Sequence, residues 1–243
     1  MAGIRNVAVA LVLTGPIALG LSACDGSADP DALFPLTPGL EWTYRIQVKP
    51  LGKELETSTR TMQNVSRDDF AGEPKVTIRR NDGGARYYVA ERDDGYYRVA
   101  MKSVIHHHPI IDQPPIKILP LPVKAGATWI EPAHTYMLGR AKTFITEHAP
   151  GNTITLDYRV ESENVDVDVP AGHFTGCAAV IGETSFHLGA GVGFLPSDVP
   201  IVQKEWYCPG VGLVRLERDE KVTNSARVIT GGRLKMELLH GPS

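Results

Sequence analysis

Residues 41–49 read Glu-Trp-Thr-Tyr-Arg-Ile-Gln-Val-Lys, so that apolar or aromatic residues alternate with polar ones. In an extended chain Trp42, Tyr44, Ile46 and Val48 would share one side, and the polar residues would share the other. A period of two is typical of a strand that has one face in a core and the other in water. The stretch therefore predicts a sheet that is covered on one face.

The same alternation recurs in residues 154–160 and 165–169, and no window of a dozen residues combines a helical period with helix caps. Residues tolerant of tight turns separate the apolar stretches, as antiparallel neighbours require. These turn sequences include 81–84 (Asn-Asp-Gly-Gly), 93–95 (Asp-Asp-Gly), 170–172 (Pro-Ala-Gly) and 231–232 (Gly-Gly). The chain is therefore expected to be mainly β and mostly antiparallel, with little helix.

Two features refine this expectation. Residues 86–101 predict a hairpin, because two tyrosine-rich stretches flank the turn at Asp93 to Gly95. Four prolines occur from 109 to 120. Since proline donates no ladder hydrogen bond, this stretch is expected to be an edge strand or an extended connection rather than a central strand.

Residues 35–42 and 122–129 share one pattern: proline, aliphatic residue, two residues, glycine, two residues, tryptophan. The glycine allows a tight bend, and Trp42 or Trp129 would then open a strand and bury a large ring. The pattern predicts two equivalent turns into one sheet. A role in stacking on a ligand is the alternative, and the candidate ligand-binding residues are Trp42, Tyr44, Trp129 and Trp206.

The N-terminus has the order of a secretory signal. Arg5 is followed by an uncharged apolar run over 7–23, which is shorter than the roughly 20 apolar residues of a membrane span and contains Gly15 and Pro16. The ending Leu-Ser-Ala-Cys at 21–24 resembles the lipobox of bacterial lipoprotein signals, which implies cleavage before Cys24 and its acylation with palmitate-type chains. The alternative is an ordinary signal with a chance cysteine.

This resemblance divides the chain into a signal peptide over 1–23, an acylated tether over 24–33 and a β-rich domain over 34–243. Asp25, directly after the cysteine, resembles the inner-membrane retention signal of enteric-type bacteria. The implied location is a cell membrane, with the domain lipid-anchored and facing the periplasm of the cell envelope.

The net charge limits which molecules the protein can bind, and the cysteine content predicts a disulfide. The formal net charge is −3, and removal of residues 1–23, which carry only Arg5, would leave −4. Such acidity argues against nucleic acid, which binds basic surfaces, and leaves the acyl chains to do the anchoring. With Cys24 acylated, Cys177 and Cys208 remain as an even pair in an oxidising compartment and predict a disulfide. Two buried free thiols are the alternative.

Three stretches carry a family resemblance: 34–44 (FPLTPGLEWTY), 169–174 (VPAGHF) and 206–214 (WYCPGVGLV). They resemble the opening, middle and closing motifs of a family of uncharacterised bacterial envelope lipoproteins. That family is similar in fold to the periplasmic lipoprotein-carrier proteins. The resemblance implies a single, strongly curved antiparallel sheet, arranged as a half-barrel or sandwich.

No sequence pattern points to catalysis. The Gly-x-Ser-x-Gly, Ser-x-x-Lys and Cys-x-x-Cys patterns are absent, and the glycine-rich loop at 189–193 is followed by prolines rather than by a helix signal. His106 and His108 could share a metal ion only if the fold supplied a further ligand such as Asp112. Asp166 and Asp168 fit a polar sheet surface better than a calcium site.

The expected function is accordingly non-enzymatic, with no catalytic residue, no metal and no cofactor. A membrane-anchored lipoprotein would bind an apolar ligand, such as a lipid, or an envelope protein partner. A structural or assembly module of an envelope complex is the second hypothesis. A metal-dependent enzyme using the segment from His106 to His108 ranks below both.

Overall fold

The computed structural model describes residues 29–137, 153–188, 196–224 and 227–242. The predicted acylation site Cys24, with Asp25, and the glycine-rich loop 189–193 lie outside these residues. The strands are β1 (Glu41–Pro50), β2 (Glu56–Phe70), β3 (Glu73–Asn81), β4 (Arg86–Arg92), β5 (Gly95–Lys102), β6 (Ile110–Pro120), β7 (Thr128–His134), β8 (Thr153–Val169), β9 (Gly172–Leu188), β10 (Ser197–Cys208), β11 (Gly212–Asn224) and β12 (Arg227–His240).

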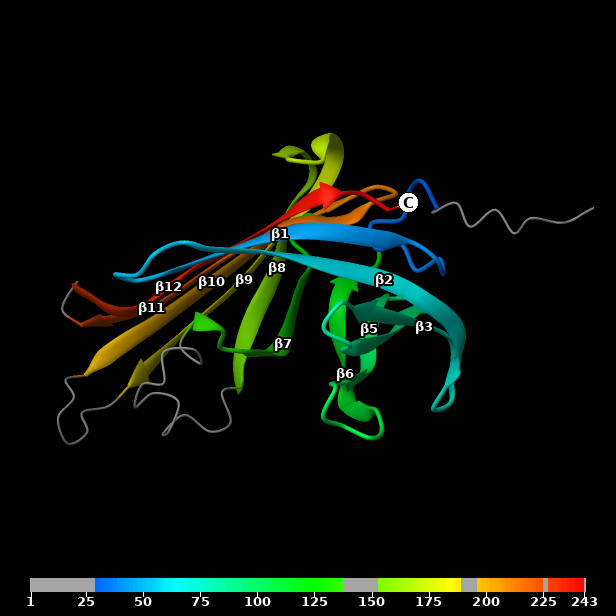
Figure 1. The fold of residues 1–243 in the computed structure, drawn as a ribbon, viewed down its shortest axis with the longest axis horizontal. Helices are drawn as coiled ribbons and strands as arrows, with labels where there is room; N and C mark the ends of the chain where they lie inside the picture. The colour runs from blue at the N-terminus through cyan, green and yellow to red at the C-terminus, as the bar shows by residue number, and fades with distance from the viewer. Residues whose placement is uncertain (1–28, 138–152, 189–195, 225–226, 243) are drawn as a thin grey trace, which may run out of the picture.

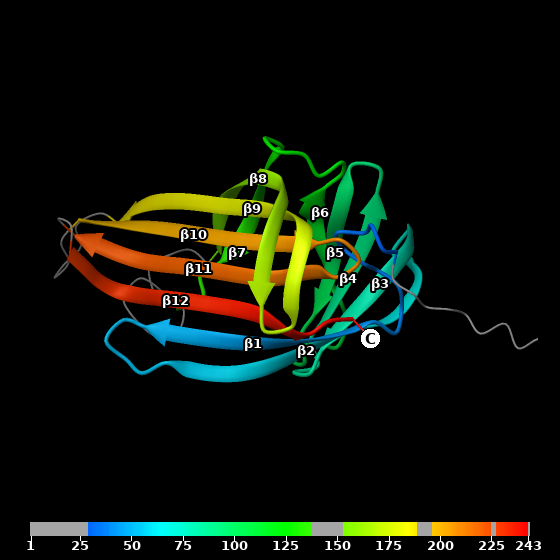
Figure 2. The ribbon, with the colours of Figure 1, turned by 90° about the horizontal axis from the view of Figure 1, so that it is seen from above.

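All of these strands belong to one sheet in the order β6-β5-β4-β3-β2-β1-β12-β11-β10-β9-β8-β7. Neighbours along the chain pair antiparallel, except β6 and β7, which are the two edges of the sheet, and β1 pairs antiparallel with β12, which joins the two ends of the domain. The sheet curves until its edge strands β6 and β7 come near each other, where the Lys117 amide donates to a Glu131 carboxylate oxygen at 2.9 Å (Figures 1 and 2). The expected mainly β, curved antiparallel fold is confirmed.

Three local predictions are also confirmed. Strands β4 and β5 form the hairpin, with Arg92 opposite Gly95. The proline-containing stretch is the edge strand β6. Gly39 and Gly126 both adopt positive φ, 93° and 88°, and β1 and β7 each begin two residues later.

One turn prediction is wrong. Gly231 and Gly232 lie inside β12, not in a turn. A Cβ atom at Gly231 would overlap the backbone oxygen of Glu220 on the neighbouring β11, and one at Gly232 would overlap the Met137 side chain. The two glycines therefore serve close approach within a sheet, which is the other common use of glycine in a strand.

Aromatic and aliphatic side chains fill the interior at the end where β4 to β6 face β7 to β10. This filled end consists of the buried residues Phe34, Leu36, Val89, Tyr96, Leu119, Trp129, Val160, Val180 and Tyr207. The segment before β1 supplies the first two, and it is held in place because Asn64 donates to the backbone oxygens of Pro35 and Thr37 at 3.2 and 3.0 Å.

A disulfide joins Cys177 on β9 to Cys208 on β10, as predicted from the two cysteines that remain when Cys24 is set aside for acylation. Both sulfurs are buried in a second apolar cluster, which also contains Trp42, Tyr44 and Leu238. The bridge therefore fixes the part of the sheet where the first and last strands of the domain meet.

Candidate functional site

A hollow of about 370 Å³ opens on the concave face of the sheet. Its lining comes from strands as far apart as β4 and β10, which can meet only across the inside of the curve. The apolar lining consists of Ile46, Met62, Tyr87, Leu216, Leu234 and Met236, and the polar lining of Arg60, Asn81, His134, Tyr136, Gln203 and Arg218. We refer to this site as the concave hollow.

The apolar wall follows from the strand register. Ile46 lies opposite Met236, and Met236 lies opposite Leu216, so one row crosses β1, β12 and β11. Leu234 lies two residues along β12 on the same side. All four side chains are only half-buried although they face the inside of the sheet. The wall is therefore apolar surface that the described residues leave partly uncovered.

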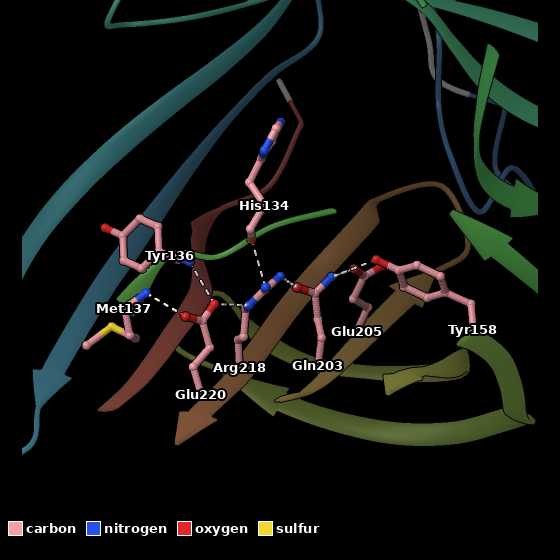
Figure 3. A network of polar contacts seen from close by, with 8 residues as sticks. All are labelled: His134, Tyr136, Met137, Tyr158, Gln203, Glu205, Arg218 and Glu220. Carbon is pink, nitrogen blue, oxygen red and sulfur yellow. Dashed lines mark hydrogen bonds and ion pairs between the residues drawn. The ribbon is translucent and has the colours of Figure 1, made fainter. Parts of the chain in front are cut away.

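A buried ion pair forms the floor beside this wall (Figure 3). Glu220 on β11 is fully buried and accepts hydrogen bonds from Arg218 Nε at 2.7 Å and from the backbone amides of Tyr136 and Met137 at 2.7 and 2.8 Å. Because a buried carboxylate is costly unless it is paired, these three donors account for its position. Glu220 thereby pins the chain after β7 across the concave face.

The network continues across β10. Arg218 donates through Nη1 to Gln203 and through Nη2 to the backbone oxygen of His134, both at 2.8 Å. Gln203 in turn donates to the Tyr158 hydroxyl at 3.3 Å and to Glu205 (Figure 3). The guanidinium is thus bonded on all three nitrogens, so it stabilises the floor rather than offering donors to a ligand.

Burial dominates the electrostatics at the inner end of the network. It raises the pKa of the Glu205 carboxyl, although the hydrogen bonds from Tyr207 and Gln203 and the charge of Arg218 act in the opposite direction. Burial also raises the pKa of the Tyr158 and Tyr207 hydroxyls, and the Glu205 charge adds to both effects. Both phenols therefore stay protonated near neutral pH; the Tyr207 hydroxyl donates to Glu205, and the Tyr158 hydroxyl accepts from Gln203.

Two arginines line the concave hollow, Arg218 at its floor and Arg60 at its rim. The Arg60 side chain is partly exposed, and its Nε lies 3.2 Å from a carboxylate oxygen of Asp82. The site as a whole combines an uncovered apolar wall, a satisfied polar floor and a paired cation at the rim. Such a surface can hold an apolar molecule, because few polar groups of the wall would lose water on binding.

The structure does not bring the four sequence-derived ligand candidates together in the concave hollow. Trp42 is 2% exposed and donates from its ring nitrogen to the Val211 backbone oxygen at 2.7 Å, and Tyr44 donates to Leu213 at 2.9 Å. Both belong to the core around the disulfide.

The other two candidates also lie away from the concave hollow: Trp129 is a buried residue of the filled end, and Trp206 is half-buried on β10. Trp129 stacks on Tyr158, with ring centroids 5.3 Å apart, and borders an open hollow of about 630 Å³ over β7 to β10 that also exposes charged residues. Trp206 is half-buried beneath the Arg215 guanidinium, which lies 5.5 Å from its ring centroid.

The proposed metal ligands His106 and Asp112 each interact with a different side chain. His106 Nδ1 lies 2.9 Å from the Ser103 hydroxyl, whereas Asp112 forms a two-point ion pair with Arg98 at 2.8 and 3.1 Å. Over the described residues, no group of three or more His, Cys, Asp and Glu side chains is placed to hold a metal ion.

The buried network was not predicted. Its signal in the sequence is that residues 214–221 carry charges at both odd and even positions. A strand with one covered face must then bury some of these charges, and Arg218 and Glu220 are the ones that face inward.

Comparison with known proteins gives only distant structural likeness. No family model matches the chain, and no curated protein sequence matches it. Similar solved structures include a protein from Bacteroides fragilis described as exported with a YmcC-like fold (TM-score 0.40, 11% identity, 86% of this chain and 97% of that one). Another is a protein from Parabacteroides distasonis described as a lipoprotein (TM-score 0.37, 13% identity, 88% and 99%). At these values neither protein indicates a function for this chain.

Among the described residues, the structure contains no helix with the length and apolar character needed to span a membrane.

Proposed function

We propose that the protein is a lipoprotein of the bacterial envelope, anchored through acylated Cys24, that holds an apolar ligand in the concave hollow. The apolar run before the lipobox-like ending supports export and acylation. The Cys177–Cys208 disulfide supports an oxidising compartment. The proposed role is carriage or retention of the ligand without catalysis, and it requires no cofactor.

The half-buried row of Ile46, Met236 and Leu216 carries this proposal. Covering apolar surface is worth about 25 cal/mol per Å². A folded protein normally covers such a row with its own side chains, as the filled end does. An acyl chain or another apolar molecule of similar width would supply the missing cover.

Lipid extraction tests the proposal on the chain from Asp25 onward, which contains every described residue. Mass spectrometry of the extract should identify a bound apolar molecule. Leu234→Trp, which fills the concave hollow, should lower its recovery at least severalfold. The matched control is Lys235→Trp on the opposite face of the same strand, which should leave recovery unchanged. Absence of any extracted molecule, or equal loss in both variants, would contradict carriage.

A structural or assembly module is the second candidate, because the protein's own aromatic and aliphatic side chains occupy one end of the interior. Such a module would dock another envelope protein through an outer surface. Crosslinking in cells separates the two functions, since a docking module should give one dominant protein adduct. That adduct should also persist in Leu234→Trp.

The anchor itself has a direct test. Cells fed radioactive palmitate should label the native chain and not Cys24→Ser.

We further propose retention at the inner membrane through Asp25. In an enteric-type host, Asp25→Ser should then move the labelled protein to the outer-membrane fraction, and an unchanged distribution would count against this role of Asp25.

A further inference from the structure

A turn and a neighbouring strand expose aliphatic side chains at one end of the sheet. The β1–β2 turn carries Leu51 and Leu55, and the start of β12 carries Val228 and Ile229, all between 43% and 55% exposed. The turn contacts β12, because the Leu51 amide donates to the Gly231 oxygen at 2.9 Å. Figure 2 shows the β1–β2 turn and the paired ends of β11 and β12 at the same end of the molecule. We refer to these four residues as the aliphatic tip.

Basic side chains from three separate segments surround the aliphatic tip. They are Lys49, Lys53, Lys221, Arg227 and Arg233, and Lys49 lies directly opposite Arg233 across β1 and β12. Asp219 pairs with Lys221 at 3.3 Å and with Arg233 at 3.1 Å. The acidic residues near the tip are Asp219, Glu54 and Glu56, against the five basic residues named above. The tip therefore has more positive than negative charge, although the chain is acidic overall.

A small hollow of about 280 Å³ is lined by residues from both the aliphatic tip and the basic set around it. Leu51, Pro50 and Val228 line it together with Lys49, Lys221, Arg233 and Asp219, and Gly52 and Gly232 contribute no side chain. Long basic side chains can lay their methylene stems along apolar surface while their charged ends extend outward. The hollow is therefore an apolar surface bordered by three cationic groups and by one carboxylate, Asp219, which pairs with two of them.

We propose that the aliphatic tip binds the surface of an anionic lipid bilayer. The four aliphatic side chains would enter the boundary between head groups and acyl chains, and the basic ring would contact the lipid phosphates. Each Lys or Arg near an anionic bilayer strengthens binding severalfold, within the short range that salt screening allows. A protein partner would require a complementary acidic and apolar surface, whereas an anionic bilayer offers both chemistries in one plane.

The tip and the first described residues lie at opposite ends of β11. Near the start of β11, the Gly210 amide donates to the Ala32 oxygen at 3.0 Å. The tip's affinity for lipid does not depend on the concave hollow or on Cys24.

The β5–β6 turn provides a matched control. Val104 and Ile105 are more exposed than any residue of the tip, at 72% and 81%. They are followed by His106, His107 and His108, and the nearby basic residues are Lys102 on β5 and Arg86, which lies opposite it on β4. Exposed aliphatic residues with fewer basic neighbours than the tip should bind an anionic bilayer more weakly.

Co-sedimentation of the chain from Asp25 onward with vesicles tests the proposal. Binding is expected with phosphatidylcholine vesicles that contain phosphatidylglycerol, and much less with phosphatidylcholine alone, and it should fall as salt is added. Leu51→Ser/Ile229→Ser and Lys53→Glu/Arg227→Glu should each lower the partition coefficient about tenfold or more. Val104→Ser/Ile105→Ser should leave it unchanged.

Three results would overturn the proposal: no binding to either vesicle, equal binding to both, or an equal loss in the β5–β6 control. Extraction of a ligand from the concave hollow is expected to be unaffected by the tip variants. A failure of the tip and a failure of the concave hollow are therefore distinguishable in the same set of proteins.

Discussion

The filled end and the concave hollow are two parts of one curved interior, and they differ in what covers the sheet. At the filled end, buried aromatic residues such as Phe34 and Tyr207 pack against each other, with ring centroids 6.3 Å apart. At the concave hollow, Leu216 and Met236 stay half-buried, and the buried groups are the charged Arg218 and Glu220. One end is therefore closed for stability, whereas the other retains an apolar wall that a ligand could cover.

The segment before β1 covers the inside of the sheet at the filled end and not at the concave hollow. It inserts Phe34 and Leu36 into the filled end, and Arg79 lies over the Phe34 ring at 4.4 Å and the Trp42 ring at 4.6 Å. Burial lowers the pKa of Arg79 to about 10, so the guanidinium is still charged near neutral pH. Residues 135–137, after β7, have the corresponding place at the concave hollow, and of these three Met137 is the buried one.

The largest effect is expected from the floor of the concave hollow. Arg218→Met would leave Glu220 buried without its cation, which should lower the free energy of unfolding by about 3–5 kcal/mol in urea titrations. Arg233→Met is the control, because its pair with Asp219 is exposed and worth about 1 kcal/mol or less. Similar losses in both variants would show that the network does not stabilise this end.

Truncation of an apolar side chain should affect the two ends unequally. Phe34→Ala removes a buried ring from the filled end and should cost about 3–4 kcal/mol. Met236→Ala removes a half-buried side chain from the wall and should cost about 1 kcal/mol. Denaturant unfolding of both variants measures the difference, and equal costs would mean that the concave hollow is as well packed as the filled end.

The disulfide should have an effect similar to that of Phe34→Ala. Its cysteines are 31 residues apart, and the chain-entropy model assigns a loop of that length about 3.5–4 kcal/mol. The Cys177→Ala/Cys208→Ala variant should therefore unfold at lower temperature in thermal scans, and added reductant should lower the transition of the native protein but not that of the variant. A native transition indifferent to reductant would contradict a stabilising bridge.

The smallest effect concerns pH. Burial raises the pKa of Glu205 in the folded state, so above the unfolded value, about 4.5, the folded protein holds a proton that the unfolded chain has released. Stability from this group is thus highest below pH 4.5 and decreases as the pH rises through the raised pKa. Glu205→Gln should flatten that decrease in urea midpoints measured between pH 4.5 and 8. An unchanged slope would mean that Glu205 ionises normally.

Local patterns in the sequence predict much of the fold. The alternation over 41–49 predicts β1, and the matching glycine-to-tryptophan patterns predict the starts of β1 and β7. These predictions succeed because strand period and turn chemistry depend on neighbouring residues.

The concave hollow could not be predicted in this way. Its wall requires β1 to pair with β12, and its floor requires Glu220 to meet the backbone of Tyr136 and Met137. Both contacts join residues far apart in the chain. The same holds for the basic ring of the aliphatic tip, since its members are scattered along a sequence whose overall charge is negative.

Ligand binding at the concave hollow is the central claim, and a fluorescence titration with cis-parinaric acid tests it most directly. The native chain from Asp25 onward, after delipidation, should bind the probe in a saturable manner at one site. Leu234→Trp should weaken binding at least tenfold, and Lys235→Trp should bind as the native protein does. Absence of saturable binding, or binding that Leu234→Trp leaves intact, would contradict the claim.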